Sequence, residues 1–168
     1  DSNQVQVIKR PGKVSELQNA INETPMIGNT GIAHTRWATH GVPNTINAHP
    51  HATRDVAIVH NGIIENFQPL RSELVSLGHS FETETDTEVV LGLLQQYLNQ
   101  GMSPQNSTLE MLKRVEGAFA LGIIFNGHDD LLIGARRGCA LAVGYGENAM
   151  FLGSDGLSLA PLTDRISY

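Results

Sequence analysis

The stretch VAIVHNGIIEN, residues 56–66, carries the strongest signal for the fold. It opens with a continuous apolar run, residues 56–59, which is typical of a strand covered on both faces. We expect this strand to end in a turn at His60-Asn61-Gly62, because Asn-Gly is a strongly preferred dipeptide of tight turns. Residues 65–78 then have helical periodicity, so a plain hairpin is not expected. The stretch predicts a buried strand, a turn and a helix.

Thr85 and Glu88 give a second strong signal, since they have the spacing of a helix capping box. A wide apolar face follows as far as Gly101, so we expect a helix with Asp86 in its first turn. Similar patterns predict three other helices, at residues 14–21 behind Ser15, at residues 67–77 behind Asn66, and at residues 107–116 with Ser107 and Glu110 as a second box. Strands are predicted at residues 4–10, 31–39, 80–82, 118–125, 131–136, 141–145 and 150–153.

The order of these elements indicates the fold class. Helices and antiparallel strands come in blocks, with turns such as Asn126-Gly127 between strands, rather than in strict β-α-β alternation. This order favours an α+β fold with sheets covered by helices. The chain of 168 residues has no repeat or linker, so we expect one domain over residues 1–168. Because Asp1 leads almost directly into an expected strand, with no initiator Met, we expect a truncated or incompletely represented N-terminus.

Composition limits the function classes. The net charge of −6 and the absence of a Lys/Arg run argue against nucleic acid or an anionic membrane as partner, and favour a small ligand. The single Cys139 cannot form an internal disulfide. There is no apolar run of membrane-spanning length and no signal peptide, so the expected location is cytoplasmic.

Arg36 and Asp86 are candidates for binding a free amino acid. An amino acid is a zwitterion, so a selective site needs a cation for its carboxylate and an acid for its ammonium group. Arginine can bind a carboxylate through two parallel bonds, and a carboxylate in a first helical turn is stabilised by backbone amides. The alternative is structural, because most Arg and Asp residues make surface ion pairs.

Asn61 and Gly62 are candidates for an oxyanion hole. A side-chain amide and a glycine N–H at the end of a buried strand can both point at one developing negative oxygen. The alternative is an ordinary turn. The position of the pair between an apolar run and a helix favours the catalytic interpretation.

Histidines suggest a rival class of function. His34, His40, His49, His51 and His60 lie in one segment, and His49-Pro50-His51 could place two imidazoles on one side of an extended chain, as in some metal hydrolases. No helical His-x-x-x-His pair or cysteine pair supports a metal site, and scattered histidines are more often hydrogen-bonded scaffold. The sequence therefore favours no metal and no cofactor.

Several motifs together closely resemble the glutaminase domain of the glutamine:fructose-6-phosphate amidotransferases, which are class II glutamine amidotransferases. The resemblance covers nearly the whole chain, at residues 32–41, 43, 47–51, 60–66, 84–89, 114–119, 135–136 and 153–155. It implies an N-terminal-nucleophile hydrolase fold, a four-layer αββα sandwich of two antiparallel sheets between helix layers, here without its N-terminal segment.

The resemblance also implies residue roles. Arg36 would bind the glutamine carboxylate, Asp86 its ammonium group, and Asn61 with the Gly62 amide would form the oxyanion hole. Residues 37–41 would belong to a loop that closes over the substrate, with Trp37, Thr39 and His40 contributing to the pocket. The structural alternative for Trp37 is a core anchor.

In that family the nucleophile is an N-terminal cysteine, activated by its own α-amine, which hydrolyses glutamine to glutamate and ammonia. This chain starts with Asp1, and Cys139, in a Gly-Cys-Ala context, is not expected to replace that cysteine. Two hypotheses follow: a glutaminase domain without its catalytic start, or a nonenzymatic domain that binds glutamine or glutamate. The implied partners are a sugar-phosphate isomerase domain in the same polypeptide and further copies in a homo-oligomer.

Overall fold

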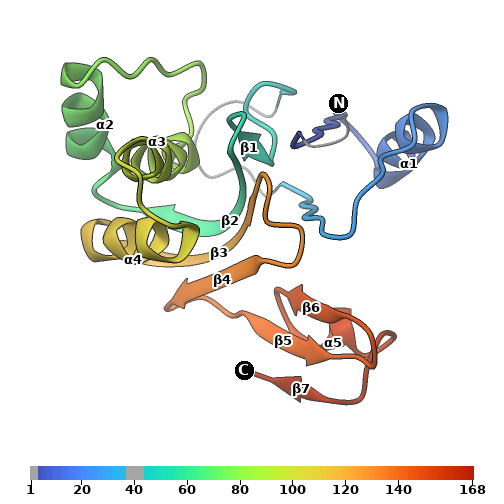
Figure 1. Cartoon of the computed structure of the whole chain (residues 1–168). Coiled ribbons are helices and arrows are strands. Elements are labelled where there is room, and N and C mark those ends of the chain that lie inside the picture. The colour runs from blue at the N-terminus through green and yellow to red at the C-terminus, as the bar shows by residue number, and fades with distance from the viewer. Residues whose placement is uncertain (1–3, 37–43) are drawn as a thin grey trace.

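The computed structural model describes residues 4–36 and 44–168. The helices are α1 (Val14–Glu23), α2 (Phe67–Ser76), α3 (Asp86–Asn99), α4 (Pro104–Arg114) and α5 (Gly156–Leu159). The strands are β1 (His51–Ala52), β2 (Val56–Ile64), β3 (Gly117–Phe125), β4 (Leu132–Arg137), β5 (Ala142–Tyr145), β6 (Met150–Gly153) and β7 (Ile166–Ser167). In Figure 1, α2, α3 and α4 lie on one side of the sheet that contains β2 and β3, while the second sheet and α5 lie beyond β4.

The strands form two antiparallel sheets, one in the order β1-β2-β3-β4 and the other in the order β6-β5-β7. Leu152 of β6 packs over Gly122 and Gly134 of the first sheet, so the two sheets face each other. On the outer face of the second sheet, Leu159 of α5 packs against Gly144 and Gly153. The order helices, sheet, sheet, helix confirms the predicted α+β sandwich with four layers.

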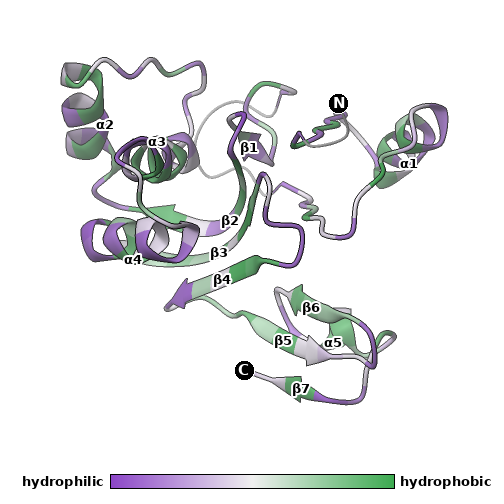
Figure 2. Cartoon of the chain, viewed as in Figure 1, coloured by the Kyte–Doolittle hydropathy of each residue, from purple (hydrophilic) through white to green (hydrophobic). Residues whose placement is uncertain are grey.

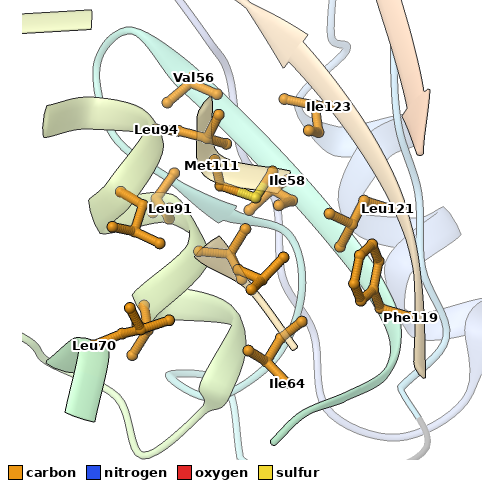
Figure 3. Close-up of a cluster of buried hydrophobic side chains, with 14 of the residues drawn as sticks. Val56, Ile58, Ile64, Leu70, Leu91, Leu94, Met111, Phe119, Leu121 and Ile123 are labelled. Carbon is orange, nitrogen blue, oxygen red and sulfur yellow. The ribbon is translucent and has the colours of Figure 1, made fainter. Parts of the chain in front are cut away.

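The core fills the space between the first sheet and the helices. Ile58 of β2 and Leu121 of β3 are fully buried on the face toward α3, and Leu94 of α3 and Met111 of α4 meet them there (Figure 3). Each such side chain contributes roughly 1.5–3 kcal/mol when it is removed from water. This packing fixes β2 against the start of α3, which is where the candidate site residues lie.

β2 does not end at His60-Asn61-Gly62. It pairs with β3 without interruption from Val56 opposite Phe125 to Ile64 opposite Gly117, so the predicted turn is wrong. Gly62 serves a different purpose, since its φ is +121° and an added Cβ would lie 2.1 Å from the Ala118 carbonyl oxygen. Glycine at this position permits a close approach of two backbones inside a strand pair.

The helix cap predicted at Thr85 is confirmed. The Thr85 side chain accepts a bond from the Glu88 amide, so the helix begins at Asp86. The Glu88 carboxylate accepts from the Glu82 and Thr83 amides and not from the Thr85 amide, which bonds the Thr83 hydroxyl, so the reciprocal half of the capping box does not form. The two bonds of Glu88 engage the backbone where a strand at residues 80–82 was predicted, and no strand forms there.

None of the three other predicted cap residues makes a side-chain capping bond. α4 begins one turn earlier than expected, with Ser103 as its cap and Pro104 in its first turn, and Ser107 is buried inside the helix. Asn66 precedes α2 but makes no capping bond, because its side chain bonds Arg114 O and the Glu116 amide instead. The cap of α1 is Lys13, not Ser15, and lacks a side-chain bond.

The remaining differences concern strands that need a distant partner. Residues 4–10 and 31–36 are not in strands, and residues 37–39 of the second prediction lie outside the described part of the chain. β1 and β7, each two residues long, were not predicted. Alternating apolar residues show that one face of a segment is buried. They do not show whether another strand lies beside the segment, and a β-strand forms only when its backbone can hydrogen-bond to such a neighbour.

Candidate functional site

The C-terminal half of β2 carries the candidate site. Figure 2 shows a hydrophilic section within this otherwise apolar strand, and it corresponds to the segment His60-Asn61-Gly62. β1 pairs only with Ala57 and Ile58, so in the described part of the chain residues 59–64 of β2 have no strand partner on that side. The polar residues of β2 thus lie along an open strand edge.

Asn61 presents an exposed amide at this edge. Its Oδ1 lies 2.7 Å from His34 Nε2, in the segment that precedes residue 37. Successive residues of a strand point to opposite faces, so His60 faces α3 while Asn61 faces away from it. The structure therefore brings His34 and Asn61 together, although they are 27 positions apart in the sequence.

Asp86 is anchored to the same strand. It is buried, with 3% of its surface exposed, and its Oδ2 accepts a hydrogen bond of 2.8 Å from the Ile64 amide of β2. Its Oδ1 lies 3.9 Å from His60 Nδ1. A negative charge in the first turn of a helix is stabilised by the backbone amides there that have no partner within the helix. The carboxylate is thus held at the end of β2 that also carries Asn61 and Gly62.

Threonine hydroxyls of α3 connect the histidines to this carboxylate. Thr87 Oγ1 lies 2.9 Å from His60 Nδ1 and 3.1 Å from His49 Nε2. The neighbouring Thr85 Oγ1 lies 3.1 Å from His51 Nε2. The ring of His49 packs against those of His34 and His51, with centroids 4.3 Å and 4.9 Å away.

Three histidines of this site, His34, His49 and His51, have lowered pKa values, which favours their neutral form at neutral pH. Burial, with nearby positive charge as a smaller cause, lowers the pKa of His49 to about 2 and that of His51 to about 3. Burial also lowers the pKa of His34, against the opposing effect of its bond to Asn61. Neutral imidazoles can each both donate and accept one bond, which suits a hydroxyl network.

The metal-hydrolase interpretation finds no support in this geometry. Among residues 4–36 and 44–168, no group of three or more His, Cys, Asp or Glu side chains is placed to hold a metal ion. His49 Nε2, His51 Nε2 and His60 Nδ1 are engaged with threonine hydroxyls instead.

Arg36 lies at the margin of the same cluster. It is half-buried, and its positive charge is among the causes that lower the pKa of His34, His49 and His51. The other predicted pocket residues, Trp37, Thr39 and His40, lie outside the described residues. The sequence predicted Arg36 and Asp86 separately, and the structure places both near the histidine cluster.

A cavity of about 580 Å³ lies beside this site rather than at it. It is lined by residues 4–6, 26–33 and 124–129, together with Pro50 and Ala57. None of the candidate site residues on β2 or α3 contributes to its wall, so we do not assign the amino-acid site to this cavity.

A family model of the glutamine amidotransferase domain matches residues 34–160. The chain belongs to this family. The matched region of this glutamine amidotransferase domain starts at His34 and includes Asn61, Gly62 and Asp86. The predicted resemblance is therefore confirmed at the level of the family.

Two curated relatives with the same name are similar to this domain over nearly its whole length. The domain is 56% identical over 157 residues to the glutamine–fructose-6-phosphate aminotransferase (isomerizing) of Zymomonas mobilis subsp. mobilis, covering 94% of this chain and 26% of that protein. It is 53% identical over 161 residues to the protein of the same name from Bartonella henselae, covering 96% of this chain and 26% of the relative. The glutamine amidotransferase domain thus spans about a quarter of these relatives.

Solved structures agree on the fold. The domain superposes on the glutamine phosphoribosylpyrophosphate amidotransferase of B. subtilis with a TM-score of 0.63 and 24% identity, over 76% of this chain and 28% of that one. A second structure, described as the allosteric regulatory enzyme of purine biosynthesis, gives the same score at 23% identity. These likenesses confirm the N-terminal-nucleophile hydrolase fold. No helix in the described part of the domain is both long and apolar enough to cross a membrane.

Sequence reasoning missed how the histidines and threonines of the site act. It considered His34, His49, His51 and His60 as metal ligands or scaffold, and it considered Thr85 only as a helix cap. The structure places the histidines around the hydroxyls of Thr85 and Thr87. The available signal was the crowding of histidines beside Asn61, together with two threonines that flank Asp86.

Proposed function

We propose that this domain binds glutamine and hydrolyses its side-chain amide to glutamate and ammonia. One observation carries the proposal: Asp86 Oδ2 accepts from the Ile64 amide, at the edge of β2 opposite β3, on the strand that carries Asn61 and Gly62. Backbone amides alternate sides along a strand, so the Gly62 N–H is expected at the same edge as that of Ile64. A carboxylate for an ammonium group and two oxyanion donors would then line one edge.

The roles of the side chains follow from charge. Asp86 would bind the substrate ammonium group, and Arg36 would bind the substrate carboxylate through its planar guanidinium. Asn61 Nδ2 and the Gly62 N–H would stabilise the oxygen of the tetrahedral intermediate, a contribution typically worth about 3 kcal/mol for each donor. Trp37, Thr39 and His40 would complete the pocket around the bound amino acid.

The reaction needs a nucleophile, which we assign to a cysteine at the N-terminus of the parent polypeptide. Its α-amine, with a pKa near 7.7 in unperturbed form, would take the thiol proton at neutral pH. The thiolate attacks the amide carbon, the C–N bond breaks, and ammonia leaves with the transferred proton. Water then cleaves the thioester and releases glutamate.

The ammonia acceptor in the parent enzyme would be fructose-6-phosphate, which would yield glucosamine-6-phosphate. Support comes from the name of the relatives, which are isomerizing aminotransferases, and from the 26% of their length that this chain spans, which leaves room for a sugar-phosphate isomerase domain. A homo-oligomeric parent enzyme is part of the same proposal.

The binding step is tested by calorimetric titration of glutamine into the protein. We expect Arg36→Ala and Asp86→Asn each to weaken glutamine binding at least tenfold, because a charged partner of a zwitterion contributes about 1.5–3 kcal/mol. Arg54→Ala and Asp130→Asn change exposed residues outside the site and serve as matched controls, with unchanged affinity expected. Equal affinity for glutamine in the wild type and in both site variants would refute the proposed roles of Arg36 and Asp86 in binding.

A further inference from the structure

The side-chain amide of Asn61 has a specific partner. Within residues 4–36 and 44–168, its one hydrogen bond joins Oδ1 to His34 Nε2 at 2.7 Å, and Asn61 is an exposed residue. A short, well-defined bond of this kind selects one of the two ways in which a planar amide can face its neighbour.

We propose that His34 is a positioning residue that orients the Asn61 amide by donating its Nε2–H to Oδ1. This inference rests on the proposed function, in which Asn61 Nδ2 donates to the oxyanion. An amide oxygen can only accept, so Nε2 must carry the proton of this bond. With Oδ1 held by His34, Nδ2 is the end of the amide that is left for the substrate.

The opposite orientation is disfavoured. If the amide turned by 180°, its NH₂ group would face Nε2, and the bond would survive only if the ring proton moved to Nδ1. His34 Nδ1 is buried and has no hydrogen-bond partner among the described residues, so a proton there would be an unsatisfied buried donor. The turned amide would also present its oxygen to a developing negative charge. Both effects oppose catalysis, so the protonation of a single histidine nitrogen selects the orientation that is useful for an oxyanion hole.

His34 is itself held in place by the network that surrounds Asp86. Its ring packs on His49 at a centroid distance of 4.3 Å and an interplanar angle of 44°. His49 Nε2 lies 3.1 Å from the hydroxyl of Thr87, the residue after Asp86. The element that carries the ammonium-binding carboxylate therefore also supports the residue that orients the oxyanion donor.

The test compares two amide replacements of His34 in the full polypeptide that carries this chain. Gln places its side-chain NH₂ near the position of Nε2, whereas Asn reaches only the position of Nδ1. We expect His34→Asn to lower the glutaminase kcat by about tenfold to a hundredfold, since losing an oxyanion donor typically costs about a hundredfold or more. We expect His34→Gln to recover most of this loss, and the KM for glutamine to change less than about twofold in both, because the oxyanion forms only after binding.

Asn61→Ala separates the inference from the function on which it rests. In the Asn61→Ala background, His34→Asn should lower kcat by less than about twofold further, because residues that act through one another are not additive. An additive loss, an unchanged kcat in His34→Asn, or a change confined to KM would each overturn the positioning role while leaving the proposed function intact. An unchanged kcat in Asn61→Ala would instead refute the oxyanion role of Asn61.

Two measurements guard against loss of folding. His128→Asn changes an exposed histidine outside the site and should retain both the activity and the thermal transition of the wild type. If His34→Asn does not fold, ¹⁵N nuclear magnetic resonance of the wild type decides the question. A protonated Nε2 on His34 at neutral pH supports the inference, and an unprotonated Nε2 overturns it.

Discussion

Gly62→Ala is expected to destabilise the protein by far more than a typical glycine substitution. Two effects combine at this position. The backbone has a φ of +121°, where an L-residue with a Cβ costs about 1–2 kcal/mol. The new Cβ would also lie 2.1 Å from Ala118 O and 2.8 Å from Phe119 Cα, and such overlap in a packed interior typically costs about 1–3 kcal/mol. The sum is about 2–5 kcal/mol, a large part of the stability of an ordinary domain.

Urea unfolding at neutral pH measures this difference. Gly127→Ala is the matched control, because its φ is +74° and an added Cβ would meet nothing within 4 Å. That control isolates the conformational cost, expected at about 1–2 kcal/mol. If Gly62→Ala lowers the free energy of unfolding by no more than Gly127→Ala does, the close contact between β2 and β3 at Gly62 is wrong.

Two further predictions concern stability. The pKa of His51 is about 3 in the folded protein and about 6.5 when unfolded, so its contribution is complete above pH 6.5 and is lost as the pH falls toward 3. His49 and His34 lose stability in the same direction, so we expect the loss in the free energy of unfolding between pH 7 and 5 to be roughly 2 kcal/mol smaller in His51→Gln than in the wild type. Urea unfolding at both pH values checks this, and an equal loss in His51→Gln would contradict it. Thr85→Val should cost about 1–3 kcal/mol, since it removes the cap of α3 and the partner of His51, whereas Ser103→Ala should cost about 1 kcal/mol for a cap alone. Equal thermal shifts in the two variants would argue against a structural role for the bond between Thr85 and His51.

Local patterns predicted the fold best where the interaction is itself local. The capping box at Thr85 and Glu88 correctly placed Asp86 at the start of α3. The two Asn-Gly dipeptides show the limit of such patterns. Asn126-Gly127 forms the predicted turn after β3, whereas Asn61-Gly62 continues a strand. The difference depends on pairing with β3, more than 50 residues away, which the dipeptide does not encode.

In the candidate site, too, single residues could be predicted from the sequence, whereas contacts between distant segments could not. Charge chemistry predicts Arg36 and Asp86 from the sequence, because binding a zwitterion requires both signs of charge. The bond between His34 and Asn61 could not be predicted, since it joins a segment before β1 to the open edge of β2. The Ser107 box failed because that residue is buried within α4, where tertiary packing and Pro104 decide the helix start.

The most direct test of the central proposal is release of labelled ammonia from glutamine that carries ¹⁵N in its side-chain amide, using the full polypeptide that contains this chain. We predict one equivalent of ¹⁵N-ammonia for each glutamate formed, with the rate strongly reduced in Asn61→Ala. Binding of glutamine without ammonia release would contradict the proposal and would favour a nonenzymatic domain that binds glutamine or glutamate.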